Sequence, residues 1–206
     1  TYGERMKETF LKILALPAEK SDNQARVQRV LEFANKHLKK NKTPSLLDVG
    51  SGLAVFPYRM KEAGWNVTAL DPDARAVIHA REQVGVRAIH ADFLTWKPKE
   101  EERFDLITLN KVLEHVKDPI AMLRKARRWI NPDGLLYVEV PDVSAAKIGP
   151  AREEFFIEHL HIFSSKSLAA ATELSGWWTS RESFKVEASG KFTRWAFLIP
   201  AGSVGL

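Results

Sequence analysis

Short apolar segments alternate with longer amphipathic segments along most of this chain. The short segments are typical of buried strands, and the longer ones repeat apolar residues at helical spacing. We predict strands at 46–49, 66–70, 86–90, 104–109 and 135–140, and helices at 55–63, 73–83 and 118–130. Strands separated by crossover helices predict a parallel sheet covered by helices on both faces.

Further elements flank this alternating core. Two helices are expected before it, the second with a capping box at Ser21–Gln24, and the Asn-Pro-Asp-Gly segment at 131–134 predicts a turn. A last helix at 164–175 and a hairpin formed by 178–187 and 192–199 follow the core. We predict a single domain, 1–206, with N-terminal cap helices in 1–42, a core in 45–140, a connecting cap in 143–163, and the last helix and hairpin in 164–200.

A glycine-rich turn follows the first predicted strand. Asp48 closes that strand, Gly50, Ser51 and Gly52 follow, and the next strand ends in Asp71. A spacing of about 20 residues between such a turn and an acid is typical of a nucleotide-type ligand that spans two adjacent strand ends, where the acid accepts ribose hydroxyls.

Two residues argue against a dinucleotide at this turn. Val55 stands where the dinucleotide fingerprint needs glycine, and the Asp48 carboxylate would repel a pyrophosphate. S-adenosylmethionine has no phosphate and carries an ammonium and a sulfonium, so an anionic strand end favours it. A nicotinamide-dependent oxidoreductase is therefore the weaker alternative.

With these residues the chain resembles the class I S-adenosylmethionine-dependent methyltransferases, whose first motif is acid-x-Gly-x-Gly-x-Gly; Ala54 replaces the third glycine. The resemblance implies an α/β, Rossmann-like, doubly wound, seven-stranded and mostly parallel sheet with an antiparallel strand from the C-terminal hairpin. It implies S-adenosylmethionine as the cofactor, with Asp92 and Phe93 at the adenine and Asn110 at the methionine end. The full predicted cofactor set is Asp48, Gly50, Ser51, Gly52, Asp71, Pro72, Asp92, Phe93 and Asn110.

The segment after the fourth strand contains Leu113-Glu114-His115. It resembles the methyltransferases of quinone biosynthesis and many sugar- and natural-product-modifying relatives. In some quinone-pathway enzymes an acid three residues before the glutamate completes a divalent-metal site, but here that residue is Lys111. Because an ammonium would compete with a cation, we predict no metal. A structural helix start is the alternative role for Glu114 and His115.

His159 and His161 precede the last helix in a His-x-His-x-Phe-Ser segment, which is similar to many small-molecule methyltransferases. The resemblance places 143–163 on the acceptor side. In an extended chain both histidines point the same way, so His161, His159 or His115 could take the acceptor's proton. Buried structural histidines are the alternative, and a metal pair with Glu158 lacks a clear third ligand.

Composition and charge limit the partners and reactions expected for this chain. The net charge of +5 comes with short basic runs at 37–42 and 124–128, late in predicted helices, so nucleic acid is an unlikely partner. Absence of cysteine excludes disulfides within the chain and cytosine-C5 methylation, which uses a cysteine nucleophile in relatives of this fold. Residues 10–16 are too short and interrupted for a membrane span, and we predict a cytoplasmic protein. Trp177, Trp178 and Trp195 predict core packing or a homodimer face.

The predicted function is methyl transfer to a small-molecule acceptor, at a hydroxyl of a sugar, quinone-like or natural-product compound. Methylation of nitrogen, carbon or RNA is the enzymatic alternative. A non-catalytic partner protein that binds S-adenosylmethionine is the other, and it need not keep an open pocket beside Asn110, His115 and His161.

Overall fold

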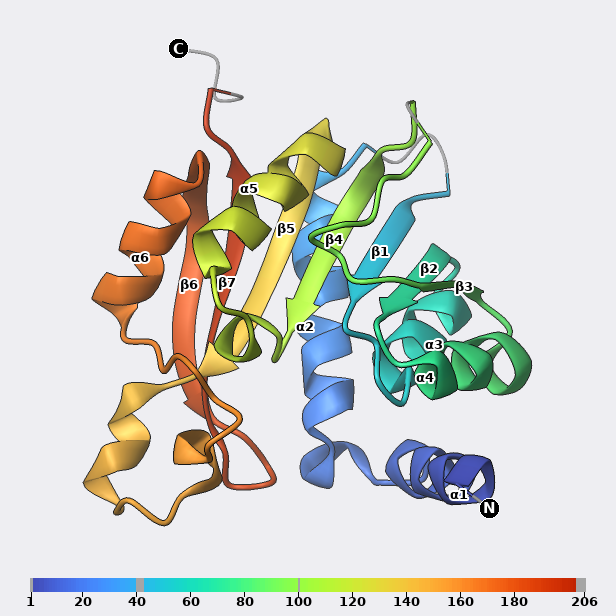
Figure 1. The fold of residues 1–206 in the computed structure, drawn as a ribbon, viewed down its shortest axis with the longest axis horizontal. Coiled ribbons are helices and arrows are strands. Elements are labelled where there is room, and N and C mark those ends of the chain that lie inside the picture. The colour runs from blue at the N-terminus through green and yellow to red at the C-terminus, as the bar shows by residue number, and fades with distance from the viewer. Residues whose placement is uncertain (1, 40–42, 100, 203–206) are drawn as a thin grey trace.

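Seven strands form one sheet at the centre of the protein (Figure 1). The computed structural model describes residues 2–39, 43–99 and 101–202, so Lys40, Asn41 and Lys42 of the first basic run lie outside the described residues. The strands are β1 (Ser45–Val49), β2 (Asn66–Asp71), β3 (Arg87–His90), β4 (Phe104–Asn110), β5 (Ile130–Pro141), β6 (Trp177–Val186) and β7 (Phe192–Pro200). The α-helices are α1 (Tyr2–Leu14), α2 (Asp22–His37), α3 (Val55–Glu62), α4 (Ala74–His79), α5 (Pro119–Trp129) and α6 (Ser165–Leu174).

The strand order is β3-β2-β1-β4-β5-β7-β6. The first five strands run parallel, and β7 is inserted antiparallel between β5 and β6. This confirms the predicted doubly wound sheet with an antiparallel hairpin. The chain reverses its direction of winding between β1 and β4, and in open α/β sheets ligands bind at such a switch point, beyond the carboxyl ends of the strands.

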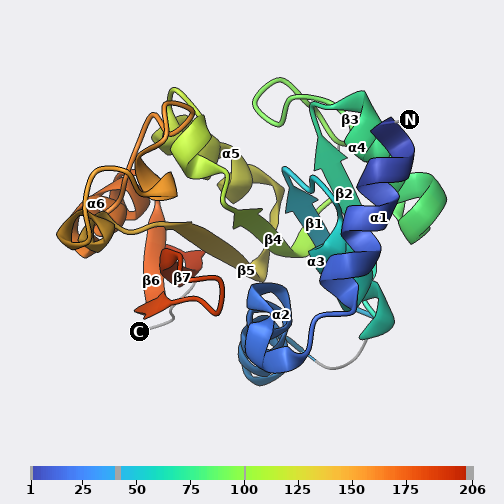
Figure 2. The same ribbon diagram turned by 90° about the horizontal axis from the view of Figure 1, so that it is seen from below.

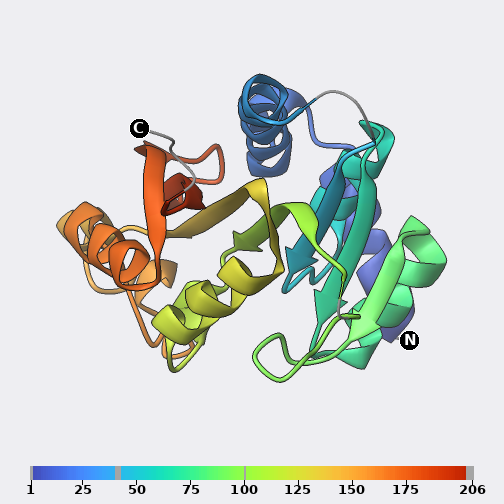
Figure 3. The ribbon, with the colours of Figure 1, turned by 90° about the horizontal axis from the view of Figure 1, so that it is seen from above.

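Helices cover both faces of the sheet (Figures 2 and 3). Leu46 of β1 packs with residues of α2 and α3, whereas its neighbour Leu47 packs with residues of α5 and α6. Because consecutive strand residues point to opposite faces, a strand covered on both sides needs apolar residues at every position. This explains the continuous apolar runs in the sequence. No described helix is long and apolar enough to cross a lipid bilayer.

Helix boundaries follow local sequence signals. The Ser21 side chain caps α2 by accepting from the Gln24 backbone N–H, and Ser164 forms a reciprocal capping box with Ser167 at the start of α6. The predicted helix 73–83 divides into α4 and a π-helical turn, η2 (Ala80–Val84). Three short 3-10 turns that flank the site are η3 (Leu113–His115), η4 (Val143–Lys147) and η5 (Glu153–Phe155), and η1 (Ala18–Lys20) precedes α2.

The predicted turn at 131–134 is wrong. β5 begins at Ile130, and its register against β4 jumps from Phe104↔Ile130 to Leu106↔Leu135, so these four residues form an irregular part of the strand. The Asn131 amide donates to an Asp105 carboxylate oxygen at 2.7 Å. This tertiary contact with β4 holds a segment whose local sequence favours a turn.

Candidate functional site

The glycine-rich turn after β1 contains residues with positive φ angles. Gly50 has φ 71°, and a Cβ there would lie 2.7 Å from the Val112 Cγ2, so only glycine fits. Ala54 is fully buried at the start of α3 with φ 52°, the left-handed conformation for which the third glycine of the family motif is suited. The turn therefore keeps the glycine-type backbone even where glycine is absent.

Asp71 at the end of β2 is fixed against this turn. Its carboxylate accepts from the Gly52 N–H at 2.9 Å and from the Asp73 N–H at 2.8 Å, and only 8% of the residue is exposed. Each carboxylate oxygen can accept more than one hydrogen bond. The remaining lone pairs are free to accept two neighbouring hydroxyl groups from a ligand, as predicted for a ribose.

Asp48 is the buried acid of the site. Its Oδ1 accepts from the Thr108 hydroxyl at 2.6 Å and from the Asn110 amide at 3.0 Å. Burial raises its pKa to about 6, because these hydrogen bonds only partly offset the loss of water. The Asn110 Oδ1 is buried and has no hydrogen-bond partner among the described residues, and Ser51 donates to the Asp48 backbone carbonyl at 2.8 Å. Asp48 and Asn110 thus offer acceptors suited to a cationic ligand group.

Two cavities meet at Gly50. One, of about 360 Å³, has Asp71, Pro72, Asp92, Phe93, Lys111 and His115 in its wall. The other, of about 390 Å³, has Asn23, Arg26, Asp48, Ser51, Asn110 and Ser189 in its wall. Eight of the nine predicted cofactor residues border one or both cavities, and Gly52 contributes through its bond to Asp71. The arrangement suits one elongated ligand bent over the glycine turn.

Two predicted adenine residues have clear structural roles as well. Asp92 is exposed, and its Oδ1 accepts from the Leu94 N–H at 2.7 Å. Phe93 is 2% exposed and packs in the core beneath the cavity. The Pro72 carbonyl oxygen lies 3.0 Å from the His90 Nε2. These contacts fix the backbone that forms the cavity wall.

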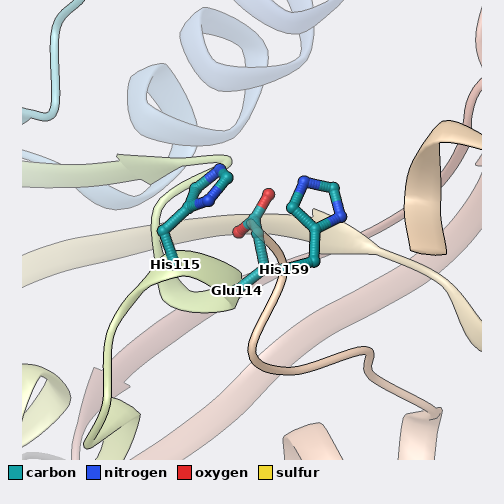
Figure 4. A group of neighbouring side chains, drawn as sticks. All are labelled: Glu114, His115 and His159. Carbon is teal, nitrogen blue, oxygen red and sulfur yellow. The ribbon is translucent and has the colours of Figure 1, made fainter. Parts of the chain in front are cut away.

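Beyond the carboxyl end of β4, three side chains converge. The carboxylate of Glu114 lies between the rings of His115 and His159 (Figure 4), and one ligand atom from each residue falls within 4.8 Å of the others. Glu114 is 1% exposed, burial raises its pKa, and its Oε2 has no hydrogen-bond partner in the part of the chain that the structure describes. The Nδ1 atoms of His115 and His159 lie 3.0 Å and 2.9 Å from the carbonyl oxygens of Glu158 and Glu154.

This trio could hold a metal ion, since a carboxylate and two imidazoles are common metal ligands. The sequence predicts no metal, because Lys111 occupies the place of a ligating acid, and this stays a prediction. His159 lies 44 positions after His115, so sequence spacing gives no signal that it joins the Glu-His pair.

His159 and His161 differ in their surroundings. Residues 156–159 form a turn, in which the His159 N–H donates to the Phe156 carbonyl at 2.9 Å. The expectation that both histidines point the same way applies to an extended chain and stays a prediction. The backbone N–H of His161 instead donates to the Glu114 carbonyl at 3.2 Å, and within the described ranges its buried Nε2 has no hydrogen-bond partner. The structure joins His159 to Glu114 and His115, with His161 outside that trio.

A buried ionic group between α2 and β5 was not predicted from the sequence. Glu139 of β5 is fully buried. The Arg26 guanidinium donates to both of its carboxylate oxygens, and the Tyr137 hydroxyl donates to Glu139 Oε2 at 2.7 Å. Burial alone would raise the Glu139 pKa, but Arg26, Lys111 and Arg29 hold it well below its usual range. The sequence signal for this group is Glu139 itself, an acid within the otherwise apolar run Leu135–Val140.

Comparison with known proteins gives three kinds of similarity. A family model described as a methyltransferase domain matches residues 19–178. A ubiquinone biosynthesis O-methyltransferase from Histophilus somni is 32% identical over 124 residues, covering 56% of this chain and 50% of that protein. One from Pseudomonas aeruginosa is 32% identical over 99 residues, covering 45% and 42%. The chain spans about half the length of the curated relatives it matches.

Solved structures share the fold at low sequence identity. Magnesium protoporphyrin IX methyltransferase from Synechocystis with bound SAH superposes with a TM-score of 0.68 at 14% identity, covering 87% of this chain and 83% of that one. The glycopeptide N-methyltransferase MtfA complexed with S-adenosylmethionine gives a TM-score of 0.65 at 14% identity, covering 85% and 87%.

Proposed function

Because this chain belongs to the methyltransferase domain family, we propose that it transfers a methyl group from S-adenosylmethionine to a hydroxyl of a small-molecule acceptor. The observation that carries this proposal is the pair of cavities that meet at Gly50, with the fixed Asp71 carboxylate in one and the buried Asp48 in the other. The solved structures with bound SAM or SAH support the choice of cofactor.

The residues fit this cofactor at both ends. In the proposal, Asp71 accepts the ribose hydroxyls, and Pro72, Asp92 and Phe93 form the adenine side of the cavity. The Asp48 carboxylate compensates the positive charge of the methionine end. The unpartnered Asn110 Oδ1 accepts from the ammonium.

S-adenosylmethionine, when bound, supplies an activated methyl group with a sulfonium leaving group. The protein then needs to align the acceptor in line and remove its proton. We assign proton removal to His115 or His159, the two histidines beside Glu114, or to His161. The buried Nε2 of His161 has no hydrogen-bond partner among the described residues.

An acceptor side that is open supports an enzyme over a non-catalytic binding partner. Of the three residues that the prediction names, Asn110 and His115 each border one of the two cavities, whereas His161 borders neither. The ubiquinone O-methyltransferases favour a quinone-like hydroxyl among the predicted acceptors. A cytoplasmic location and a homodimer stay predictions; Trp177 and Trp195 are buried, while Trp178 on β6 is 63% exposed.

The proposal predicts that Asp71→Asn weakens the binding of S-adenosylhomocysteine by tenfold or more. The ribose hydroxyls would lose a charged acceptor, and such hydrogen bonds contribute about 1.5–3 kcal/mol. Isothermal titration calorimetry of the two proteins measures this difference.

Asp73→Asn is the matched control, because Asp73 lies two residues further on, is half-exposed and caps α4. Its affinity should stay within about twofold of the wild type, as expected for surface substitutions. Equal affinities for the Asp71 variant and the wild type, or tight binding of NAD with no binding of S-adenosylhomocysteine, would contradict the proposal.

A further inference from the structure

Lys111 has a strained backbone and lies between the cavity that contains Asp71 and strand β7. It directly follows β4 with φ 59°, a left-handed conformation that is costly for a residue with a side chain. Its N–H donates to the Glu139 carbonyl at 2.8 Å, which holds its backbone beside β5. Its side chain borders the cavity that contains Asp71, and its Nζ reaches the Thr193 hydroxyl of β7 at 2.7 Å.

The Lys111 ammonium has more donors than partners. An ammonium has three N–H donors, and within the described ranges the Thr193 hydroxyl, itself fully buried, is its hydrogen-bond partner and no carboxylate pairs with it. Burial lowers the pKa of Lys111, although Glu139 and Glu114 act to raise it. Lys111 is half-buried, and an ammonium that has lost part of its water and keeps unused donors is stabilised when an anion completes its surroundings.

The nearby acids have other neighbours. Glu139 is paired with Arg26 and Arg29, and Glu187 lies 2.6 Å from the Lys185 ammonium. The Glu114 carboxylate lies between the rings of His115 and His159, and among the described residues no ion pair joins it to Lys111. The Lys111 ammonium can therefore take its counterion from a ligand in the cavity that its side chain borders.

We propose that Lys111 binds the methyl acceptor, its ammonium holding the reacting oxygen of a phenol-type hydroxyl as an anion. This inference rests on the proposed methyl transfer. The acceptor hydroxyl gives its proton to a histidine of the 159–161 segment. The oxygen then gives a lone pair to the methyl carbon, and the electron pair of the broken C–S bond stays on sulfur, which becomes a neutral thioether. Lys111 keeps its own proton throughout.

The experiment uses 4-nitrocatechol as the probe, because its absorption spectrum changes when a hydroxyl ionises. The probe is titrated with pH in the presence of the full chain saturated with S-adenosylhomocysteine. We expect the wild-type protein to lower the apparent pKa of the probe and to bind it at least tenfold more tightly than Lys111→Met does. Lys111→Arg should restore part of both effects.

Lys117→Met is the matched control, since Lys117 is exposed in the same loop. It should behave like the wild type. All variants must bind S-adenosylhomocysteine within about threefold of the wild type, which shows that they fold. An unshifted probe with the wild-type protein, or an equal shift with Lys111→Met, overturns the role of Lys111. Loss of S-adenosylhomocysteine binding by the wild type would instead refute the proposed function.

Discussion

At the residue scale, Asp48 combines binding chemistry with a cost in stability. It is 3% exposed, and burial raises its pKa from 3.8 to about 6. A carboxyl with a raised folded-state pKa takes up a proton more readily in the folded protein than in the unfolded chain. The stability of the ligand-free protein therefore falls as the pH rises from about 4 to about 6, by up to about 3 kcal/mol.

Asp48→Asn should raise the melting temperature of the ligand-free protein at pH 7 and weaken the binding of S-adenosylhomocysteine. The neutral amide removes the cost of a buried charge but no longer attracts the ammonium of the ligand. Differential scanning calorimetry and titration calorimetry measure the two effects. The idea fails if both quantities fall together, because the substitution would then have damaged the fold.

A pH series provides the control for this interpretation. Wild-type affinity for S-adenosylhomocysteine should be constant above pH 7 and fall about tenfold per unit below pH 6, as Asp48 takes up its proton. Asp48→Asn should lack this dependence. The same slope in both proteins would assign the titration to another group.

At the element scale, a buried ion pair joins α2 to β5. Arg26 and Arg29 lie on one face of α2, and both reach the fully buried Glu139 of β5. Arg29 also stacks over Trp195, with its guanidinium carbon 4.8 Å from the ring centroid. Because the same helix presents Asn23 and Arg26 to the larger cavity, this docking also sets one wall of the site.

Arg26→Met should lower the free energy of unfolding by about 3 kcal/mol, because it leaves a buried carboxylate with weaker partners. Urea denaturation followed by circular dichroism measures the loss. Adding Glu139→Gln to this variant should recover part of it, since the uncompensated charge is then gone. If the double variant is less stable than Arg26→Met alone by the full cost of Glu139→Gln, the pair is not coupled.

At the scale of the whole molecule, the site is assembled from segments far apart in the chain. The carboxyl ends of β1 and β2 supply Asp48 and Asp71, and that of β4 supplies Asn110, while the start of α2 and the β6–β7 turn close the larger cavity. Asp22 links these last two segments, accepting from the Ser189 N–H at 3.0 Å and from its hydroxyl at 2.5 Å. A ligand that fills both cavities, as we propose, would contact both halves of the sheet.

S-adenosylhomocysteine should accordingly slow amide hydrogen exchange in several separate segments. We expect protection at 22–26, 50–54, 71–74 and 110–115, because binding restrains their local opening. The exposed edge strand β6 should show little change. Hydrogen–deuterium exchange with mass spectrometry measures this, with Asp71→Asn at the same ligand concentration as the control. Protection confined to one segment would contradict a ligand that spans both cavities.

The sequence by itself determined the order of strands and helices, the glycine turn and the acids at strand ends. These features depend on local signals: strand and helix periodicity, the left-handed backbone at Gly50, and the fixed spacing to Asp71. Even there, local signals failed at 131–134, where contact with Asp105 holds a strand-like backbone.

Only the tertiary structure decided which side chains meet. The pairing of Arg26 with Glu139, the approach of His159 to Glu114, and the reach of Lys111 to Thr193 join residues 113, 45 and 82 positions apart. Such contacts depend on how helices pack on the sheet and on where the inserted strand β7 lies. Burial then sets the charge properties of Asp48 and Lys111, because loss of water, which no local pattern records, dominates their pKa values.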